Sequence, residues 1–131
     1  MPPKPHILFV CGRNKWRSPT AARIYANDQR IEVRSAGIAA QSAHRVSQQD
    51  LEWADLVLVM EPEHKARLLE TFRGTRLPPI ECLEIADDFG FMDDALIELV
   101  REGTETHLSA RFGIGQDTSP EAAPGTSGRR T

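Results

Sequence analysis

A short apolar run, residues 7–10, ends at Cys11, and Arg17 follows it after five intervening residues. The run predicts a buried parallel strand, and Ser18-Pro19 predicts the first turn of a helix, where a proline loses no hydrogen bond. Cys11 then falls at the carboxyl end of a first strand, the edge at which open parallel sheets bind ligands. Five residues suffice for a loop to curl around a tetrahedral anion, and an arginine at the helix start adds a planar, two-pronged donor. This pattern predicts a phosphate-binding loop with a thiol nucleophile.

The rest of the chain alternates between strand and helix patterns. Strands are expected at 7–10, 31–35, 56–60 and 80–85, and helices at 19–27, 47–53, 62–73 and from Asp93 or Asp94 to Gly103. Such alternation predicts a three-layer α/β/α fold around a four-stranded parallel sheet, with the phosphate-binding loop after the first strand. Residues 1–103 are expected to form one domain. Residues 104–131 are rich in Gly, Pro, Ser and Thr and predict a disordered C-terminal tail.

Composition narrows the classes of function. A net charge of -3 gives no bulk attraction to nucleic acid or to an anionic membrane, so an anionic substrate must be drawn by a local rim such as Arg13, Lys15 and Arg17. No signal peptide or membrane span is apparent, and we expect a soluble, cytoplasmic monomer. The four histidines are not spaced as paired metal ligands, so we expect no metal site, and we expect no cofactor. With only two cysteines, Cys11 and Cys82, a disulfide scaffold is not expected.

The strand, the loop and the helix start resemble those of the low-molecular-weight protein tyrosine phosphatases. The resemblance covers roughly the first hundred residues. Its further matches are Asn14, Ser18, Ser35-Ala36-Gly37, Trp53-Ala54-Asp55 before the apolar run 56–60, and Asp87-Asp88-Phe89. The compact loop, and Asp-Asp-Phe in place of Asp-Pro-Tyr, look like a shorter bacterial branch of that family.

The resemblance implies a role for each matching residue. Cys11 would attack phosphorus and form a phosphocysteine, Arg17 would bind two phosphate oxygens, and Ser18 would donate a hydrogen bond to the sulfur. The implied substrate-binding residues are Gly12, Arg13, Asn14, Lys15, Trp16 and Phe89. For Trp16, packing under the loop is favoured over a place on the rim.

The resemblance also implies a general acid that protonates the leaving oxygen. Asp87 matches the first residue of the family's Asp-Pro-aromatic signature, and Asp88 is the alternative because the expected proline is absent. Gly12 departs from longer members of the family, which carry a larger residue after the cysteine. The slot for a tyrosine ring is therefore expected to be shallow.

Three functions follow from these observations. The favoured one is a phosphomonoester hydrolase that acts on phosphorylated proteins or small aryl phosphates, as a protein tyrosine or aryl phosphatase. A thiol-dependent arsenate reductase is an alternative on the same fold, but it needs resolving cysteines and only Cys82 is available. The third is a module that binds phosphoproteins without turnover.

Overall fold

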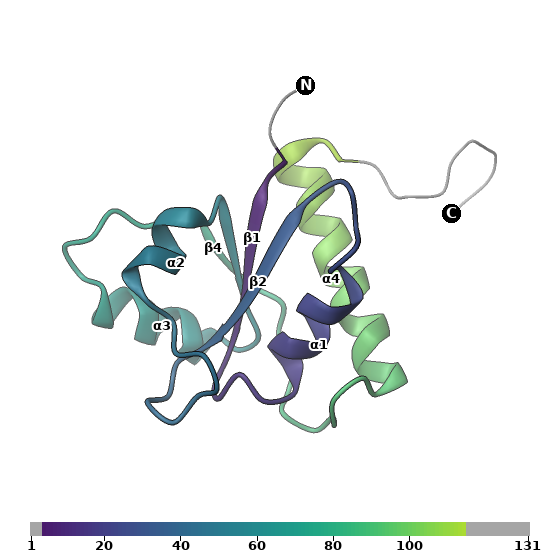
Figure 1. Cartoon of the computed structure of the whole chain (residues 1–131), viewed down its shortest axis with the longest axis horizontal. Helices are drawn as coiled ribbons and strands as arrows, with labels where there is room; N and C mark the ends of the chain where they lie inside the picture. Colours follow the sequence, from purple (N-terminus) through teal and green to yellow (C-terminus); the bar gives the residue numbers. More distant parts are fainter. Residues whose placement is uncertain (1–3, 115–131) are drawn as a thin grey trace.

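Four parallel strands form a sheet in the order β2-β1-β3-β4, covered by helices on both faces (Figure 1). The computed structural model describes residues 4–114 of the chain. The strands are β1 (His6–Cys11), β2 (Glu32–Gly37), β3 (Leu56–Val59) and β4 (Ile80–Cys82). The helices are α1 (Arg17–Ile24), α2 (Gln48–Trp53), α3 (Pro62–Thr71) and α4 (Asp94–Phe112).

The sheet separates the core into two apolar clusters, and the side chains of β1 contribute to both. Ile7, Phe9 and Cys11 belong to the apolar cluster beneath α1 and α4, whereas Leu8 and Val10 belong to the cluster beneath α2 and α3 (Figure 1). Every second side chain of a strand points to the same face, so a wholly apolar strand supplies both clusters. The predicted three-layer α/β/α architecture is confirmed.

The strand order opens a crevice at the end of β1. The chain leaves β1 through α1 toward β2 on one side, and it leaves β3 through α3 toward β4 on the other. The connections after these neighbouring strands therefore diverge to opposite faces of the sheet, and ligands of open α/β sheets bind in the crevice between such connections. Cys11 is the last residue of β1 and stands at this point.

Helix starts follow the local sequence signals. Ser47 and Asp50 form a capping box at α2. Pro62 occupies the first turn of α3. At α4 the alternatives are resolved in favour of Asp93, whose side chain accepts a hydrogen bond from the backbone N–H of Ala95 at 2.9 Å.

The end predicted for the last helix is wrong. Helix α4 continues through Gly103 to Phe112 and buries Thr104 and Leu108, so residues 104–112 belong to the folded domain. A Cβ on Gly103 would lie 2.8 Å from Cδ2 of Leu83, the end of a flexible side chain that packs beside the helix here. The remainder of the predicted tail, residues 115–131, lies outside the described residues.

Strand β4 is also shorter than predicted, since it ends at Cys82. Glu84 has a positive φ of 56°, which takes the chain out of the extended conformation before Ile85.

Candidate active site

The loop after β1 folds back over its own cysteine. Asn14 has a left-handed backbone conformation, φ 55°, and its N–H lies 3.2 Å from Sγ of Cys11, to which it donates a hydrogen bond. Asparagine tolerates this conformation better than most residues with a side chain. The sequence therefore bends the loop so that a backbone amide faces the sulfur, and Cys11 itself is 3% exposed.

Side chains behind the loop hold it in place. Nδ2 of Asn14 donates to Oγ of Ser18 and to Oγ of Ser35, each at 3.0 Å. Oγ of Ser18 lies 3.0 Å from Sγ of Cys11 and 3.3 Å from the carbonyl oxygen of Ala36. The amide of Asn14 thus connects the loop to α1 and β2, and the Ser18 hydroxyl is within hydrogen-bond distance of the sulfur.

The end of β2 also constrains the loop. A Cβ on Gly37 would lie 2.2 Å from Oγ of Ser42 and 2.7 Å from the backbone nitrogen of Asn14. Only glycine allows β2 to approach the loop this closely.

Arg17 is buried although it carries a charge. It is 4% exposed, forms an ion pair with Glu61, and donates a hydrogen bond of 2.7 Å to the carbonyl oxygen of Ile85. Its Nε lies 3.7 Å from Oδ1 of Asp87, whose side chain is 61% exposed. Groups from the connections after β3 and β4 therefore hold the guanidinium that the sequence assigns to phosphate binding.

A cavity of about 430 Å³ lies over this arrangement. Seven residues predicted from the sequence line it, namely Cys11, Gly12, Arg13, Lys15, Trp16, Arg17 and Asp87. Asn14, within the loop, and Ser18, in the first turn of α1, do not line the cavity and instead contact one another and the sulfur.

Three predicted residues are placed differently from the rest. Phe89 does not line the cavity and packs against the core cluster beneath α1 and α4. Asp88 is exposed and does not line the cavity either. Trp16 is 38% exposed and lies on the cavity wall, with Nζ of Lys15 4.8 Å from its ring centre, so the expectation that it packs under the loop is wrong.

The cavity also contains three residues that the sequence analysis missed: Glu61, Glu63 and His64. They follow directly after β3, and the carboxyl ends of neighbouring parallel strands meet at one edge of the sheet. Their position directly after a strand pattern is a signal for a place at this edge, but the pattern does not specify that the strand lies beside β1.

His64 is held in a defined orientation. It is 6% exposed, and its Nδ1 accepts a hydrogen bond of 3.2 Å from the backbone N–H of Glu61. Burial, and then the nearby charge of Arg17, lower the pKa of His64 below its usual value near 6.5. The imidazole is therefore neutral at neutral pH.

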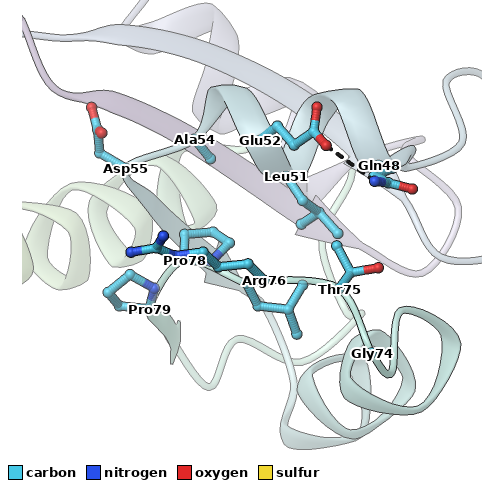
Figure 2. Close-up of a pocket in the computed structure, with 11 residues that line it drawn as sticks. Gln48, Leu51, Glu52, Ala54, Asp55, Gly74, Thr75, Arg76, Pro78 and Pro79 are labelled. Atoms are coloured by element: carbon cyan, nitrogen blue, oxygen red, sulfur yellow. Dashed lines mark hydrogen bonds between the residues drawn. The ribbon is translucent and has the colours of Figure 1, made fainter.

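A second cavity lies away from Cys11. It has a volume of about 730 Å³ and lies between α2 and the segment 74–79 (Figure 2). Asp55 and Pro79, which precede β3 and β4, contribute to it, so it opens at the amino edge of the sheet. No residue that lines it also lines the cavity over Cys11.

No helix within residues 4–114 is long and apolar enough to cross a membrane. Over the same span, no group of three or more His, Cys, Asp or Glu side chains is arranged to hold a metal ion.

Comparisons with known proteins agree with this geometry. No family model matches the chain. A curated relative, the protein-arginine-phosphatase of Geobacillus stearothermophilus, is 37% identical in an alignment that covers 50% of this chain and 61% of the relative. The solved structure of the YwlE arginine phosphatase from the same organism matches with a TM-score of 0.63 and 25% identity, over 86% of this chain and 99% of that one.

Tyrosine phosphatases share the fold at lower identity. Wzb from Escherichia coli K30 matches with a TM-score of 0.63 and 17% identity, over 83% of this chain and 99% of that one. A low-molecular-weight protein tyrosine phosphatase from Streptococcus pyogenes matches with a TM-score of 0.61 and 17% identity, over 82% of this chain and 93% of that one. The chain therefore has the fold of the low-molecular-weight protein tyrosine phosphatases, the family that the loop after β1 resembles.

Proposed function

We propose that this protein is a cysteine-dependent phosphatase that works through a phosphocysteine intermediate. The observation that carries the proposal is the meeting of Cys11 and Arg17 at one cavity, with the Ser18 hydroxyl 3.0 Å from the sulfur. A nucleophile, a bidentate cation and a donor to the sulfur are what transfer of a phosphoryl group to sulfur and on to water requires.

In the first step, the Cys11 thiolate attacks phosphorus in line, and the bond from phosphorus to the leaving oxygen breaks. Asp87 gives its proton to that oxygen, which leaves as an alcohol or a phenol. Arg17 and the loop amides stabilise the equatorial phosphoryl oxygens in the transition state.

In the second step, Asp87 takes a proton from water, whose oxygen attacks phosphorus while the bond from sulfur to phosphorus breaks. The hydrogen bond from Ser18 stabilises the thiolate that leaves. The products are inorganic phosphate and the original enzyme.

For the substrate we propose a phosphotyrosine or another aryl phosphate on a protein or a small molecule. The exposed ring of Trp16 on the cavity wall supports an aromatic leaving group. A phosphorylated arginine is the second candidate, favoured by the activity named for the curated relative and by the carboxylates of Glu63 and Asp87 at the cavity.

Arsenate reduction through a cysteine relay is poorly supported. Cys82 lies on β4, two strands away from β1, which corresponds to roughly 10 Å. It also packs against the cluster beneath α2 and α3, whereas Cys11 belongs to the opposite cluster. A disulfide needs Cα atoms within about 7 Å.

A cytoplasmic location and action as a monomer complete the proposal. A reducing compartment keeps the Cys11 thiol usable. The cavity with its nucleophile, arginine and acid is formed within one chain, so it needs no second copy.

The decisive test follows para-nitrophenyl phosphate turnover by the wild type and by Cys11→Ser in the presence of a metal chelator. Turnover that depends on Cys11, with a nitrophenol burst before phosphate appears, supports the proposal. Phosphotyrosine and phosphoarginine peptides then distinguish the two substrates. Binding of phosphopeptides by a wild type that turns over none of these compounds would instead identify a binding module.

A further inference from the structure

Because residue 12 is a glycine, no side chain covers His64 in the wall of the cavity next to it. A Cβ on Gly12 would lie 3.7 Å from Nε2 of His64. His64 lines the cavity over Cys11 and also an adjoining cavity of about 370 Å³, which Gly12 lines as well. The imidazole therefore forms part of the wall directly beside the residue that follows the nucleophile.

The hydrogen bonding of His64 fixes where its proton resides. Because Nδ1 accepts the backbone N–H of Glu61, the neutral ring carries its hydrogen on Nε2. Within residues 4–114, Nε2 has no hydrogen-bond partner. The His64 side chain is only 6% exposed, but Nε2 is not a buried unpaired atom, since within residues 4–114 the one such side-chain atom is Oγ1 of Thr104. The Nε2–H donor is therefore accessible to a molecule in the cavity.

Charged groups surround this donor without pairing with it. Arg17, Glu61, Glu63 and Asp87 all act electrostatically on His64. Burial and Arg17 keep the ring neutral, so Nε2–H is a donor of fixed direction and no net charge.

We propose that His64 contacts the substrate directly and that its Nε2–H donates a hydrogen bond to the bridging oxygen of a phosphate ester. This inference rests on the proposed phosphatase function. An ester oxygen has two lone pairs, so it can accept from His64 while Asp87 delivers the proton that releases it. A phosphorylated arginine carries nitrogen at the bridging position and presents an N–H there, which faces the His64 donor unfavourably. His64 is then a specificity-determining residue that favours phosphate esters over phosphoarginine.

Two substitutions separate this contact from the role of His64 at the start of α3. In His64→Asn, the side-chain oxygen replaces Nδ1 as the acceptor for the Glu61 N–H, but the Nε2 donor is lost. In His64→Gln, the amide nitrogen reaches toward the position of Nε2, but the acceptor at the helix start is lost. If the Nε2 hydrogen bond to substrate matters, activity should fall more in His64→Asn. If the acceptor at the start of α3 matters, stability should fall more in His64→Gln.

The experiment measures phenyl phosphate and inorganic phosphate on the wild type and on both variants. For phenyl phosphate the readout is kcat/KM, and for inorganic phosphate it is the inhibition constant. His64→Asn is expected to lower kcat/KM about fivefold to tenfold, as for one hydrogen bond, and to leave the inhibition constant within about twofold. His64→Gln should recover at least half of the loss on a logarithmic scale, while a phosphoarginine peptide should lose nothing in His64→Asn.

Other results overturn the proposal. Equal losses for phenyl phosphate and inorganic phosphate, no loss for either, or lower activity in Gln than in Asn would each show that the ring does not contact the ester oxygen. If the wild type hydrolyses none of phenyl phosphate, para-nitrophenyl phosphate and the phosphopeptides, the phosphatase proposal fails. The dissociation constants of phenyl phosphate and inorganic phosphate then test the His64 contact directly, with the same expected pattern.

Discussion

Arg17 forms an ion pair with Glu61, the residue immediately before helix α3. The guanidinium is almost fully buried, whereas the carboxylate is partly open to the cavity. A bound phosphate would place a second anion against the same guanidinium. Glu61 is thus the group that balances the charge of Arg17 within the folded chain.

Glu61→Gln should reveal this balance. The amide oxygen still accepts a hydrogen bond, but the buried arginine loses the nearer of its two anionic partners and keeps only Asp87, so the free energy of unfolding should fall by about 1–2 kcal/mol. Inorganic phosphate supplies the missing charge, and it should raise the urea midpoint more in the variant than in the wild type.

Glu63→Gln is the matched control for that substitution. Glu63 lines the same cavity but makes no ion pair within residues 4–114. The free energy of unfolding of the Glu63→Gln protein, and the shift of its urea midpoint by phosphate, should therefore stay at wild-type values. Identical phosphate shifts in the wild type and in Glu61→Gln would contradict the role given to Glu61.

Gly37→Ala should damage the loop from outside it. The new methyl group would press on Ser42 and on the backbone nitrogen of Asn14, whose N–H donates to Cys11. Overpacking of this kind costs about 1–3 kcal/mol, and we expect kcat/KM to fall by at least about tenfold because the loop amide moves. Thermal unfolding and steady-state kinetics measure the two effects.

Adding Ser42→Gly separates the two clashes. The double variant removes the contact with Ser42 and leaves the one with Asn14, so stability should recover in part while activity stays low. Gly90→Ala serves as the control because its Cβ would meet nothing within 4 Å. Full recovery of activity in the double variant would mean that the approach of β2 to Asn14 does not shape the loop.

Asp87→Asn should slow turnover according to the leaving group. Phenyl phosphate expels a poor leaving group and needs its proton, whereas para-nitrophenyl phosphate does not. The first-step rate should therefore fall far more for phenyl phosphate. Asp88→Asn is the neighbouring control, since Asp88 does not line the cavity. Equal losses on both substrates in Asp87→Asn would assign the acid to another group.

Protein stability should decrease at mildly acidic pH because of His64. The folded-state pKa of His64 is lowered below about 6.5 by burial and by Arg17, so the unfolded chain binds the proton first as the pH falls. Stability from this group is complete above pH ~6.5 and is lost below it. His64→Asn lacks this titration, and its free energy of unfolding should fall less between about pH 7.5 and 5. Parallel pH profiles for the two proteins would exclude a depressed pKa.

The fold and the nucleophilic loop could be predicted because their signals are local in the sequence. An apolar run that ends at Cys11 and a proline in the next helical turn specify a strand, a loop and a helix start without knowledge of distant contacts. The Ser47 capping box and the turn at Asn14 depend on equally local chemistry, and the structure contains both.

The predictions that fail concern residues whose placement depends on contacts with distant segments of the chain. Gly103 reads locally as a helix end, but α4 continues through it because Thr104 and Leu108 are buried beyond it. Phe89 matches a pocket-lining residue by its motif, yet it packs in the core. Glu61 and His64 reach the site only because β1 and β3 are neighbours in the sheet, and the sequence pattern does not specify that pairing.

Trapping of the phosphoenzyme tests the central claim most directly. Asp87→Asn, mixed with para-nitrophenyl phosphate and quenched in acid during turnover, is analysed by peptide mass spectrometry beside the wild type and Cys11→Ser. The proposed mechanism predicts a phosphoryl group on the peptide that contains Cys11, most abundant in Asp87→Asn and absent from Cys11→Ser. Hydrolysis without phosphorylated Cys11 in either active protein would contradict a phosphocysteine mechanism.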